Sequence, residues 1–219
     1  SLKIKDSVEM KIDIERREGE MNTFIVHPDE DGPHPVILFL MDAPGKREEL
    51  HNMARRIASC GYWVMLPNLY YRRVREFISD GTQKNREVMF EHKNSLSYDM
   101  VVEDCEFMLK EALKYESASK GPVGCVGYCM SGPFVFSAAA KINHRIRATA
   151  SIHGVDLYTD SSNSPHKNAH KIKKYQSSVP FRASLTANIG SSFAEIILTG
   201  FLLKTLASSF LVILLKGSS

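Results

Sequence analysis

The sequence predicts an α/β fold with a mostly parallel sheet and helices on both of its faces. Two observations support this prediction. Short, continuous apolar runs recur between residues 35 and 153, as expected for strands that are covered on both sides. Segments with the helical spacing of apolar residues separate these runs. Such an alternation of strand and helix is typical of parallel sheets with right-handed connections.

The first two predicted strands lie within residues 10–27 and form a hairpin. MKIDIERRE alternates apolar and polar side chains, and MNTFIVH follows after the turn residues Glu18-Gly19-Glu20. The apolar run PVILFLM, residues 35–41, is typical of a strand buried on both faces. YWVMLP, residues 62–67, predicts another buried strand, which Pro67 ends.

Helices are predicted between and after these strands. The first runs from about residue 47 to residue 60, and four of its apolar residues share one face: Leu50, Met53, Ala54 and Ile57. A short helical piece follows, and then a longer helix over residues 97–115. The buried stripe of that helix is Val101, Cys105, Met108 and Ala112. Residues 121–140 predict a strand, a turn and a helix, and RATASIH, residues 147–153, predicts one more strand.

The carboxyl ends of the predicted parallel strands mark where a site is expected. Ligands of such sheets bind at those ends, because the connecting loops meet there. The ends are Met41-Asp42-Ala43, Pro67-Asn68-Leu69, Tyr128-Cys129 and His153-Gly154. The residues that could take part in binding or catalysis are therefore expected at one edge of the sheet.

Composition and charge argue against several classes of function. The chain has 43% hydrophobic and 24% charged residues, as globular proteins do, and its net charge of +3 is too small to indicate nucleic-acid binding. The densest basic group, Arg72, Arg73 and Arg75, predicts a local anion site or a solvated face. None of the four cysteines forms a CxxC pair and no His or Cys stands at zinc-finger spacing, so no metal site is predicted. Reduced thiols without a signal peptide favour a cytoplasmic protein.

One stretch, GPVGCVGYCMSGPFVFSAAA at residues 121–140, places a cysteine between an apolar strand and an apolar helix. A nucleophile elbow needs small residues two before and two after the nucleophile, because larger ones would clash with strand and helix. Gly127-x-Cys129-x-Ser131 fits this pattern, with serine in place of the last glycine. Unpaired N–H groups at the helix start would favour a thiolate, and the N–H of Met130 would be one oxyanion donor.

The alternative interpretation of Cys129 is a core cysteine on a tight turn. The apolar strand before it, the small residues at both required places and the apolar helix after it favour the nucleophile. The other three cysteines are expected in the core: Cys60, Cys105 and Cys125.

Three segments resemble a known family: VGYCMSG, MDAPGKREELHNMARRIASCGYWVMLPNLYYRR and SIHGVDLYTDSSNSPH. Together they are similar to the dienelactone hydrolase (carboxymethylenebutenolidase) family of α/β-hydrolases. The resemblance runs from about residue 10 to about residue 173, in the order of the family. It implies an α/β-hydrolase fold and an esterase or lactonase with a Cys-His-Asp triad.

The resemblance also implies roles for individual positions. Cys129 corresponds to the nucleophile, and Met130 and Ala43 to the two residues whose amides hold the oxyanion. Asp42 stands where other members carry a glutamate that holds the resting thiol; alternatively, it caps the following helix. Arg72 corresponds to an arginine that pairs with a substrate carboxylate, which implies an anionic substrate. The alternative for Arg72 is a surface arginine near a loop.

The C-terminal part of the sequence departs from the family pattern. The resemblance places the catalytic Asp after the next strand and the His near the C-terminus, but the last Asp here is Asp160 and the last His is His170. We therefore divide the chain into a hydrolase-like core, residues 1–173, and a divergent tail, residues 174–219. This tail is expected to be helical or not natively folded, which would truncate or alter the sheet.

The apolar run of this tail, residues 193–215, leaves three interpretations open. It is a non-native end fused to a truncated hydrolase, a helix that covers the sheet edge, or a segment that contacts a membrane. Its length reaches the roughly 20 residues that span a bilayer. Lys204 near its middle costs about 2.5–3.5 kcal/mol on insertion scales, so membrane contact is not favoured.

A hydrolase without its triad base is expected to be impaired, because general acid–base catalysis typically contributes about 10²–10⁴-fold. One hypothesis for a replacement base is His153, which closes the strand beside the nucleophile strand; the alternative is a histidine of the pocket wall. A polar loop contains two further histidines and two aspartates, at no spacing typical of a metal site: His166, His170, Asp156 and Asp160.

The sequence thus predicts a cofactor-free hydrolase of small esters or lactones, impaired as written. Cys129 would attack the carbonyl, and the substrate-binding residues would be Arg72, Asp42 and His153. The rival prediction is a non-catalytic module of the same fold. Such a module would bind acyl or lactone ligands in the cleft, or pair with other chains through its apolar tail.

Overall fold

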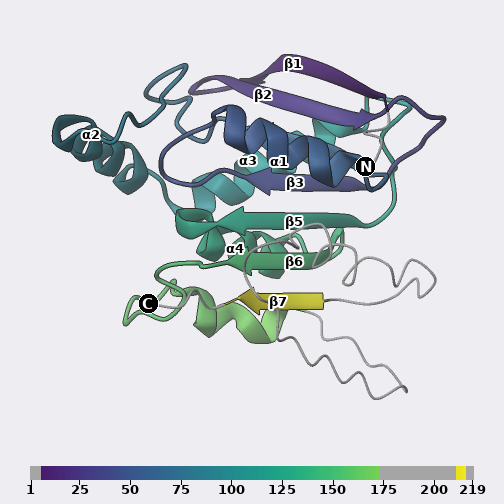
Figure 1. Ribbon diagram of the computed structural model, residues 1–219. Helices are drawn as coiled ribbons and strands as arrows, with labels where there is room; N and C mark the ends of the chain where they lie inside the picture. Colours follow the sequence, from purple (N-terminus) through teal and green to yellow (C-terminus); the bar gives the residue numbers. More distant parts are fainter. Residues whose placement is uncertain (1–5, 173–210, 216–219) are drawn as a thin grey trace.

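The computed structural model describes residues 6–172 and 211–215 of the chain (Figure 1). These residues form a seven-stranded sheet in the order β1-β2-β4-β3-β5-β6-β7. β1 pairs antiparallel with β2 and β2 antiparallel with β4, whereas every later pair is parallel. The predicted α/β fold with a mostly parallel sheet is confirmed.

The elements follow the predicted order along the chain. The strands are β1 (Ser7–Arg16), β2 (Gly19–Pro28), β3 (Val36–Leu40), β4 (Trp63–Pro67), β5 (Val123–Tyr128), β6 (Ile146–Ile152) and β7 (Leu211–Leu215). The helices are α1 (Glu48–Ala58), α2 (Gln83–Asn94), α3 (Tyr98–Ala112) and α4 (Gly132–Lys141). Two short 3-10 helices complete the set: η1 (Cys129–Ser131) and η2 (Pro165–Lys171).

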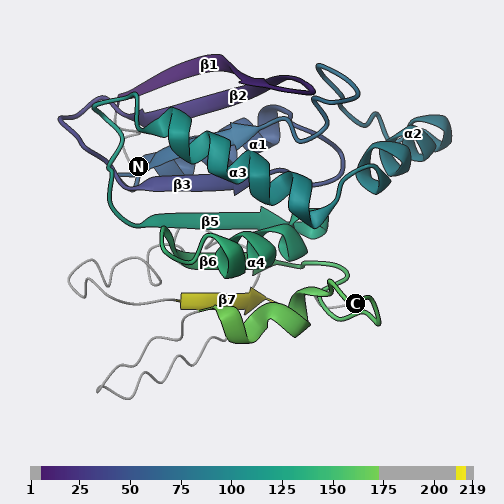
Figure 2. The ribbon, with the colours of Figure 1, turned by 180° about the vertical axis from the view of Figure 1, so that it is seen from behind.

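Helices cover both faces of the sheet, which explains the continuous apolar runs. α1 lies over one face in Figure 1, and α3 and α4 lie over the opposite face, which Figure 2 brings to the front. Every residue of β3 and β4 is buried as a result. The predicted stripe of α3 is buried too, and with it a charged residue, Asp104.

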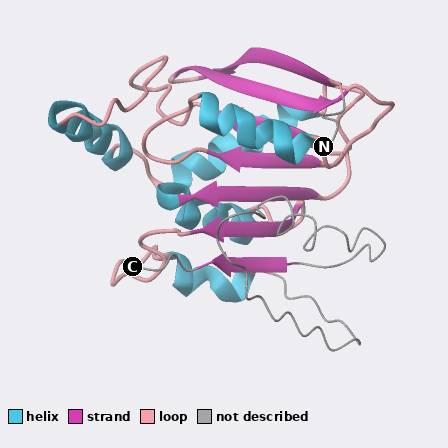
Figure 3. Ribbon diagram, viewed as in Figure 1, coloured by secondary structure: helices cyan, strands magenta, loops and turns pink. Residues whose placement is uncertain are grey.

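The register of the parallel strands brings three loops together at one edge. Leu40 of β3 pairs with Gly127 of β5, and Tyr128 pairs with Ile152 of β6. The loops after these strands therefore begin side by side, at the arrowheads in Figure 3. This is the edge where the sequence predicts the site.

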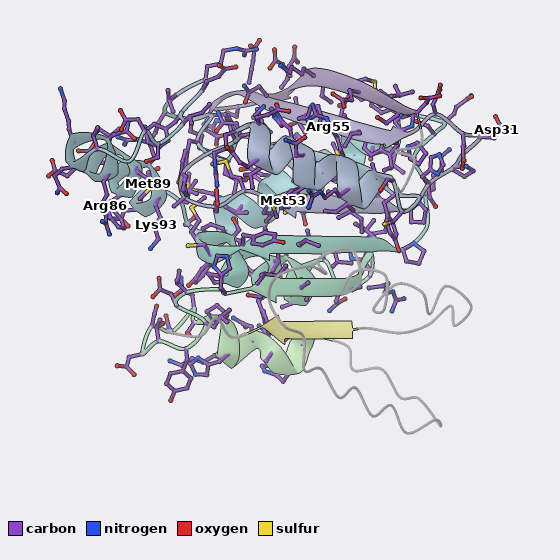
Figure 4. All side chains as sticks on the ribbon, viewed as in Figure 1. Asp31, Met53, Arg55, Arg86, Met89 and Lys93 are labelled. Atoms are coloured by element: carbon purple, nitrogen blue, oxygen red, sulfur yellow. The ribbon has the colours of Figure 1, made fainter. Side chains whose placement is uncertain are left out.

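α2 lies beyond this same edge of the sheet and carries Arg86, Met89 and Lys93 (Figure 4). The Thr82 hydroxyl accepts a hydrogen bond from the Asn85 N–H and so caps the start of α2. Lys93 Nζ is 3.8 Å from Asp156 Oδ2, which links α2 to the loop after β6. The sequence predicts only a short helical piece here, and the structure shows a helix of 12 residues near the candidate site.

The last strand changes how part of the apolar tail is interpreted. Residues Leu211–Leu215 form β7, which pairs parallel with Ala148–Ile152 of β6. For these five residues the helical expectation is wrong, and the edge of β6 is paired. The rest of the run 193–215 lies outside the described residues, so its nature and the division of the chain at residue 173 stay predictions. No helix among the described residues is long and apolar enough to cross a membrane.

Candidate active site

Cys129 stands at a strained corner between β5 and α4. Its φ angle is 50°, in the left-handed region that L-residues with a side chain rarely adopt. A Cβ on Gly127 would overlap the Ser131 carbonyl oxygen and lie 2.8 Å from Val135 Cγ1. The chain can therefore turn here only with a glycine two residues before the cysteine, as an elbow requires.

The small residues after Cys129 are also required by close packing. A Cβ on Gly132 would lie 2.5 Å from both Gly154 Cα and Ser151 Oγ. The loop after β6 therefore packs directly against the start of α4. The same loop holds the elbow by a backbone hydrogen bond, in which the Val155 N–H donates to the Cys129 carbonyl at 3.2 Å.

Ser131 has a function that the sequence pattern does not reveal. It replaces the last glycine of the elbow, is fully buried, and its hydroxyl donates to the Met41 carbonyl at 2.5 Å. This bond ties the elbow to the end of β3, where the second oxyanion residue is expected. Cys129 to Ser131 form the 3-10 turn η1, and α4 follows directly from Gly132, in the predicted order of strand, turn and helix.

Ala43 lies in the loop after β3 and is nearly buried. The Tyr70 hydroxyl donates to the Ala43 carbonyl at 2.9 Å and contacts Met130 Sδ at 3.3 Å. The two predicted oxyanion residues, Ala43 and Met130, thus flank a single side chain. Burial raises the pKa of Tyr70, so its hydroxyl stays protonated and able to donate.

Asp42 is paired with an arginine of its own loop. Arg47 Nη1 lies 2.6 Å from Asp42 Oδ1, and Arg47 Nη2 lies 3.0 Å from Asp42 Oδ2. This two-point pairing raises the pKa of Arg47. Arg47 is the N-cap residue of α1, and its side chain makes no capping hydrogen bond to the first N–H groups of the helix. Both Asp42 oxygens thus accept hydrogen bonds from Arg47, so the alternative in which Asp42 caps the helix is wrong, and the carboxylate orders the loop through Arg47 instead.

Arg72 does not present a free guanidinium to an anionic substrate. Both of its terminal nitrogens donate to Asp104, each at 2.8 Å, and the Asp104 side chain is fully buried. Burial alone would lower the pKa of Arg72, but the hydrogen bonds and charge of Asp104 raise it. The expected carboxylate partner is thus a residue of this chain. The sequence could not show this, because Asp104 is 32 residues away.

His153 lies beside the elbow in the register of the sheet, directly after the Tyr128–Ile152 pair. Its φ angle is 39°, its side chain is exposed, and its ring meets the edge of the Tyr128 ring at 5.6 Å. A base role toward Cys129 stays a prediction, and the ring contact with Tyr128 fits the pocket-wall alternative.

His92 of α2 is a buried residue that sequence reasoning missed. Its ring stacks on Tyr70 at 5.2 Å and meets the edge of Phe77 at 4.8 Å. Its Nδ1 accepts a hydrogen bond from Arg73 Nε at 3.2 Å. Burial, and then the charge of Arg73, lower the pKa of His92. No sequence signal marked it, because it lies on a helix that is otherwise polar.

The other cysteines differ in burial. Cys105 and Cys125 are buried as predicted, and their mutual hydrogen bond and burial raise the pKa of Cys105. Cys60 is partly buried, packs against the core and contacts the Arg56 carbonyl at 3.5 Å, so it lies at the edge of the core rather than within it. In the polar loop after β6, His166 bonds to Ser164 at 2.8 Å and stacks on Tyr158.

Comparison with known proteins agrees with this geometry. The model of the dienelactone hydrolase family matches residues 21–183. Carboxymethylenebutenolidases of Pseudomonas putida and Pseudomonas knackmussii are each 27% identical over 131 residues, which is 59% of this chain and 55% of theirs. The chain therefore spans about half the length of the curated relatives it matches.

Solved structures show the same fold at lower identity. A protein of Klebsiella pneumoniae assigned as a dienelactone hydrolase superposes with a TM-score of 0.67 at 17% identity, covering 98% of this chain and 87% of that one. The dienelactone hydrolase of Anabaena variabilis gives a TM-score of 0.57 at 16% identity, covering 97% and 88%. With its elbow, its sheet order and the match over residues 21–183, the chain belongs to the dienelactone hydrolase family of α/β-hydrolases.

Proposed function

We propose that this chain cleaves small esters or lactones with Cys129 as the nucleophile. The observation that carries the proposal is the left-handed backbone of Cys129 at 50°, at the elbow that Gly127 permits. Strain of this kind is kept where the surrounding structure enforces it, which is typical of functional sites. Family membership and the names of the relatives support the same reaction class.

The proposed reaction proceeds through a thiol ester. Cys129 Sγ attacks the carbonyl carbon, and the amides of Met130 and Ala43 hold the oxygen while it is negatively charged. The bond to the leaving alcohol breaks, and the alcohol takes up the proton that the thiol lost. Water then attacks the thiol ester, the C–S bond breaks, and the acid and the thiol are released.

We propose further that the second half of this reaction is slow in the chain as written. Residues 174–219 contain no Asp and no His, so the sequence offers no counterpart for two members of the triad. General acid–base help is worth about 10²–10⁴-fold, and its loss slows both the attack and the release. An acyl group on Cys129 is therefore expected to persist.

The proposed substrate class carries no charge requirement. The sequence-based expectation of an anionic substrate rested on Arg72, and both terminal nitrogens of its guanidinium donate to Asp104. Small uncharged esters and lactones are therefore the first substrates to test.

A second candidate is a non-catalytic module that binds acyl ligands in the same place. The chain has an intact elbow, but its sequence offers no counterpart for two triad members. This combination favours the non-catalytic module over a function that is unrelated to the hydrolase fold. p-Nitrophenyl acetate separates the candidates when nitrophenolate release is followed together with the intact mass of the chain. Release that continues past one nitrophenolate per chain, however slowly, supports the enzyme, whereas release that stops at one equivalent with a permanent acetyl group on Cys129 supports the non-catalytic module.

Two variants make this experiment specific. Cys129→Ser is expected to lose the rapid acylation, because an alcohol without a base is a far weaker nucleophile than a thiol. Cys60→Ser is the matched control, since Cys60 is the other partly exposed cysteine and lies at the end of α1. Equal acylation of the wild type and Cys129→Ser would sink the proposal.

A further inference from the structure

The hydroxyl of Tyr70 touches both residues of the proposed oxyanion pocket. It donates to the Ala43 carbonyl at 2.9 Å and lies 3.3 Å from Met130 Sδ. Tyr70 follows β4, Ala43 follows β3, and Met130 follows β5, so the contact joins three loops of the site. The side chain is 1% exposed, which means that water does not compete for the hydroxyl.

Tyr70 is itself held rigidly by its surroundings. Its N–H donates to Asn68 Oδ1 at 3.0 Å. Its ring contacts His92, stacked at 5.2 Å, and Phe77, edge-on at 6.0 Å, and these two rings also meet each other at 4.8 Å. The amide of Asn68 in turn donates to the Val74 and Arg75 carbonyls, at 3.0 and 2.8 Å. A hydroxyl fixed in this way can set the position of the groups it contacts.

The loop that carries Ala43 is also held from its outer side. Gly45 has a φ angle of 96°, and a Cβ there would overlap the Phe77 carbonyl oxygen. The Ser79 N–H donates to the Pro44 carbonyl at 2.9 Å. The segment from Tyr70 to Ser79 therefore contacts the loop at Ala43, Pro44 and Gly45, and Tyr70 supplies the contact to Ala43.

We infer that Tyr70 is the positioning residue of the oxyanion pocket, acting through Ala43 and Met130. This inference rests on the proposed function. Removing one oxyanion donor typically costs about 10²–10³-fold in rate, and a small misplacement costs part of that. The ion pair between Arg72 and Asp104 anchors the same segment two residues after Tyr70, which gives Arg72 a structural role.

The test compares two reactions of the same sulfur atom in Tyr70→Phe. Acylation by p-nitrophenyl acetate passes through an oxyanion, whereas alkylation by iodoacetamide is a displacement at saturated carbon and forms none. We expect acylation of Cys129 to slow by about 10–100-fold while alkylation stays within about two-fold of the wild type. A merely structural role would change both rates together.

Tyr71→Phe is the matched control. It removes a buried hydroxyl one residue along the chain, which donates to Asp104 at 2.9 Å and touches neither Ala43 nor Met130 in any described contact. Its ratio of acylation to alkylation should equal that of the wild type. An unchanged ratio in Tyr70→Phe overturns this inference alone. A wild type that never acylates Cys129 overturns the proposed function, and this inference with it.

Discussion

At Cys129 the backbone is held in a conformation that costs an ordinary residue about 1–3 kcal/mol. Neighbouring contacts from three directions maintain it. The Val155 N–H binds the Cys129 carbonyl, the Ser131 hydroxyl binds the Met41 carbonyl, and Gly132 packs on Gly154. The side chain is thereby set at the corner of the elbow, and this order at residue scale is what makes an otherwise ordinary cysteine a candidate nucleophile.

Gly127→Ala tests how tightly this corner is packed. The added methyl group would overlap the Ser131 carbonyl oxygen and approach Val135 Cγ1, neither of which can move without shifting α4. We expect the free energy of unfolding to fall by about 1–3 kcal/mol, as overpacked cores do, and acylation of Cys129 to slow. Urea denaturation and the acylation rate measure the two effects.

The control for this prediction is Gly121→Ala, where a Cβ would meet only Ser119 Oγ at 3.3 Å. Its unfolding free energy should change by no more than about 0.5 kcal/mol. If Gly127→Ala were as stable as this control, the elbow would be looser than its backbone geometry requires.

The residues that the sequence identified well are those whose role is local. Gly127 and Cys129 are two positions apart, so spacing alone predicts their geometry. The ion pair of Arg72 could not be predicted in this way, because its partner, Asp104, comes from another element. A charged residue within a helix is normally exposed, and nothing in the sequence marks Asp104 as buried.

At the scale of elements, Asp104 connects three parts of the molecule. From its place on α3 it accepts hydrogen bonds from Arg16 at the end of β1 and from Tyr71 and Arg72 after β4. Arg16 lies over the ring of Phe107 at 3.6 Å, which extends the cluster along α3. The sequence predicts the helices and strands from their periodicity, but these connections depend on how the elements pack.

Asp104→Asn should destabilise the chain strongly. It keeps the shape of the side chain but removes the one buried carboxylate that two arginines share, and the side chains of these arginines are 2% and 10% exposed. Breaking a buried pair from one side typically costs about 3–5 kcal/mol. Urea denaturation should show a loss of this order, and Tyr71→Phe, which removes one hydrogen bond, a loss of about 1 kcal/mol.

Glu103→Gln provides the comparison for Asp104→Asn. Glu103 also contacts Arg16, at 3.1 Å, but its side chain is 54% exposed. Exposed ion pairs contribute about 0–1 kcal/mol, so this neighbour should unfold nearly as the wild type does. Similar losses in both variants would mean that Asp104 is not the centre of the cluster.

For the whole molecule, the order of the strands places the site. Parallel strands β3, β5 and β6 end together, and the loops after them carry Ala43, Cys129 and His153. The alternation of strands and helices in the sequence predicted this arrangement. It did not predict β7, because the apolar run that contains it, residues 193–215, has the length of a helix rather than of a strand.

Two neighbouring proline variants test whether β7 pairs with β6 in solution. Val212 lies opposite Thr149 and Ile213 opposite Ala150, and successive residues of a strand point their N–H groups to opposite sides. Only one of Val212→Pro and Ile213→Pro therefore removes a hydrogen bond to β6. That variant should lose about 1–3 kcal/mol of unfolding free energy and aggregate more readily, while the other changes less. Urea denaturation and light scattering measure both, and identical behaviour of the two variants would contradict the pairing.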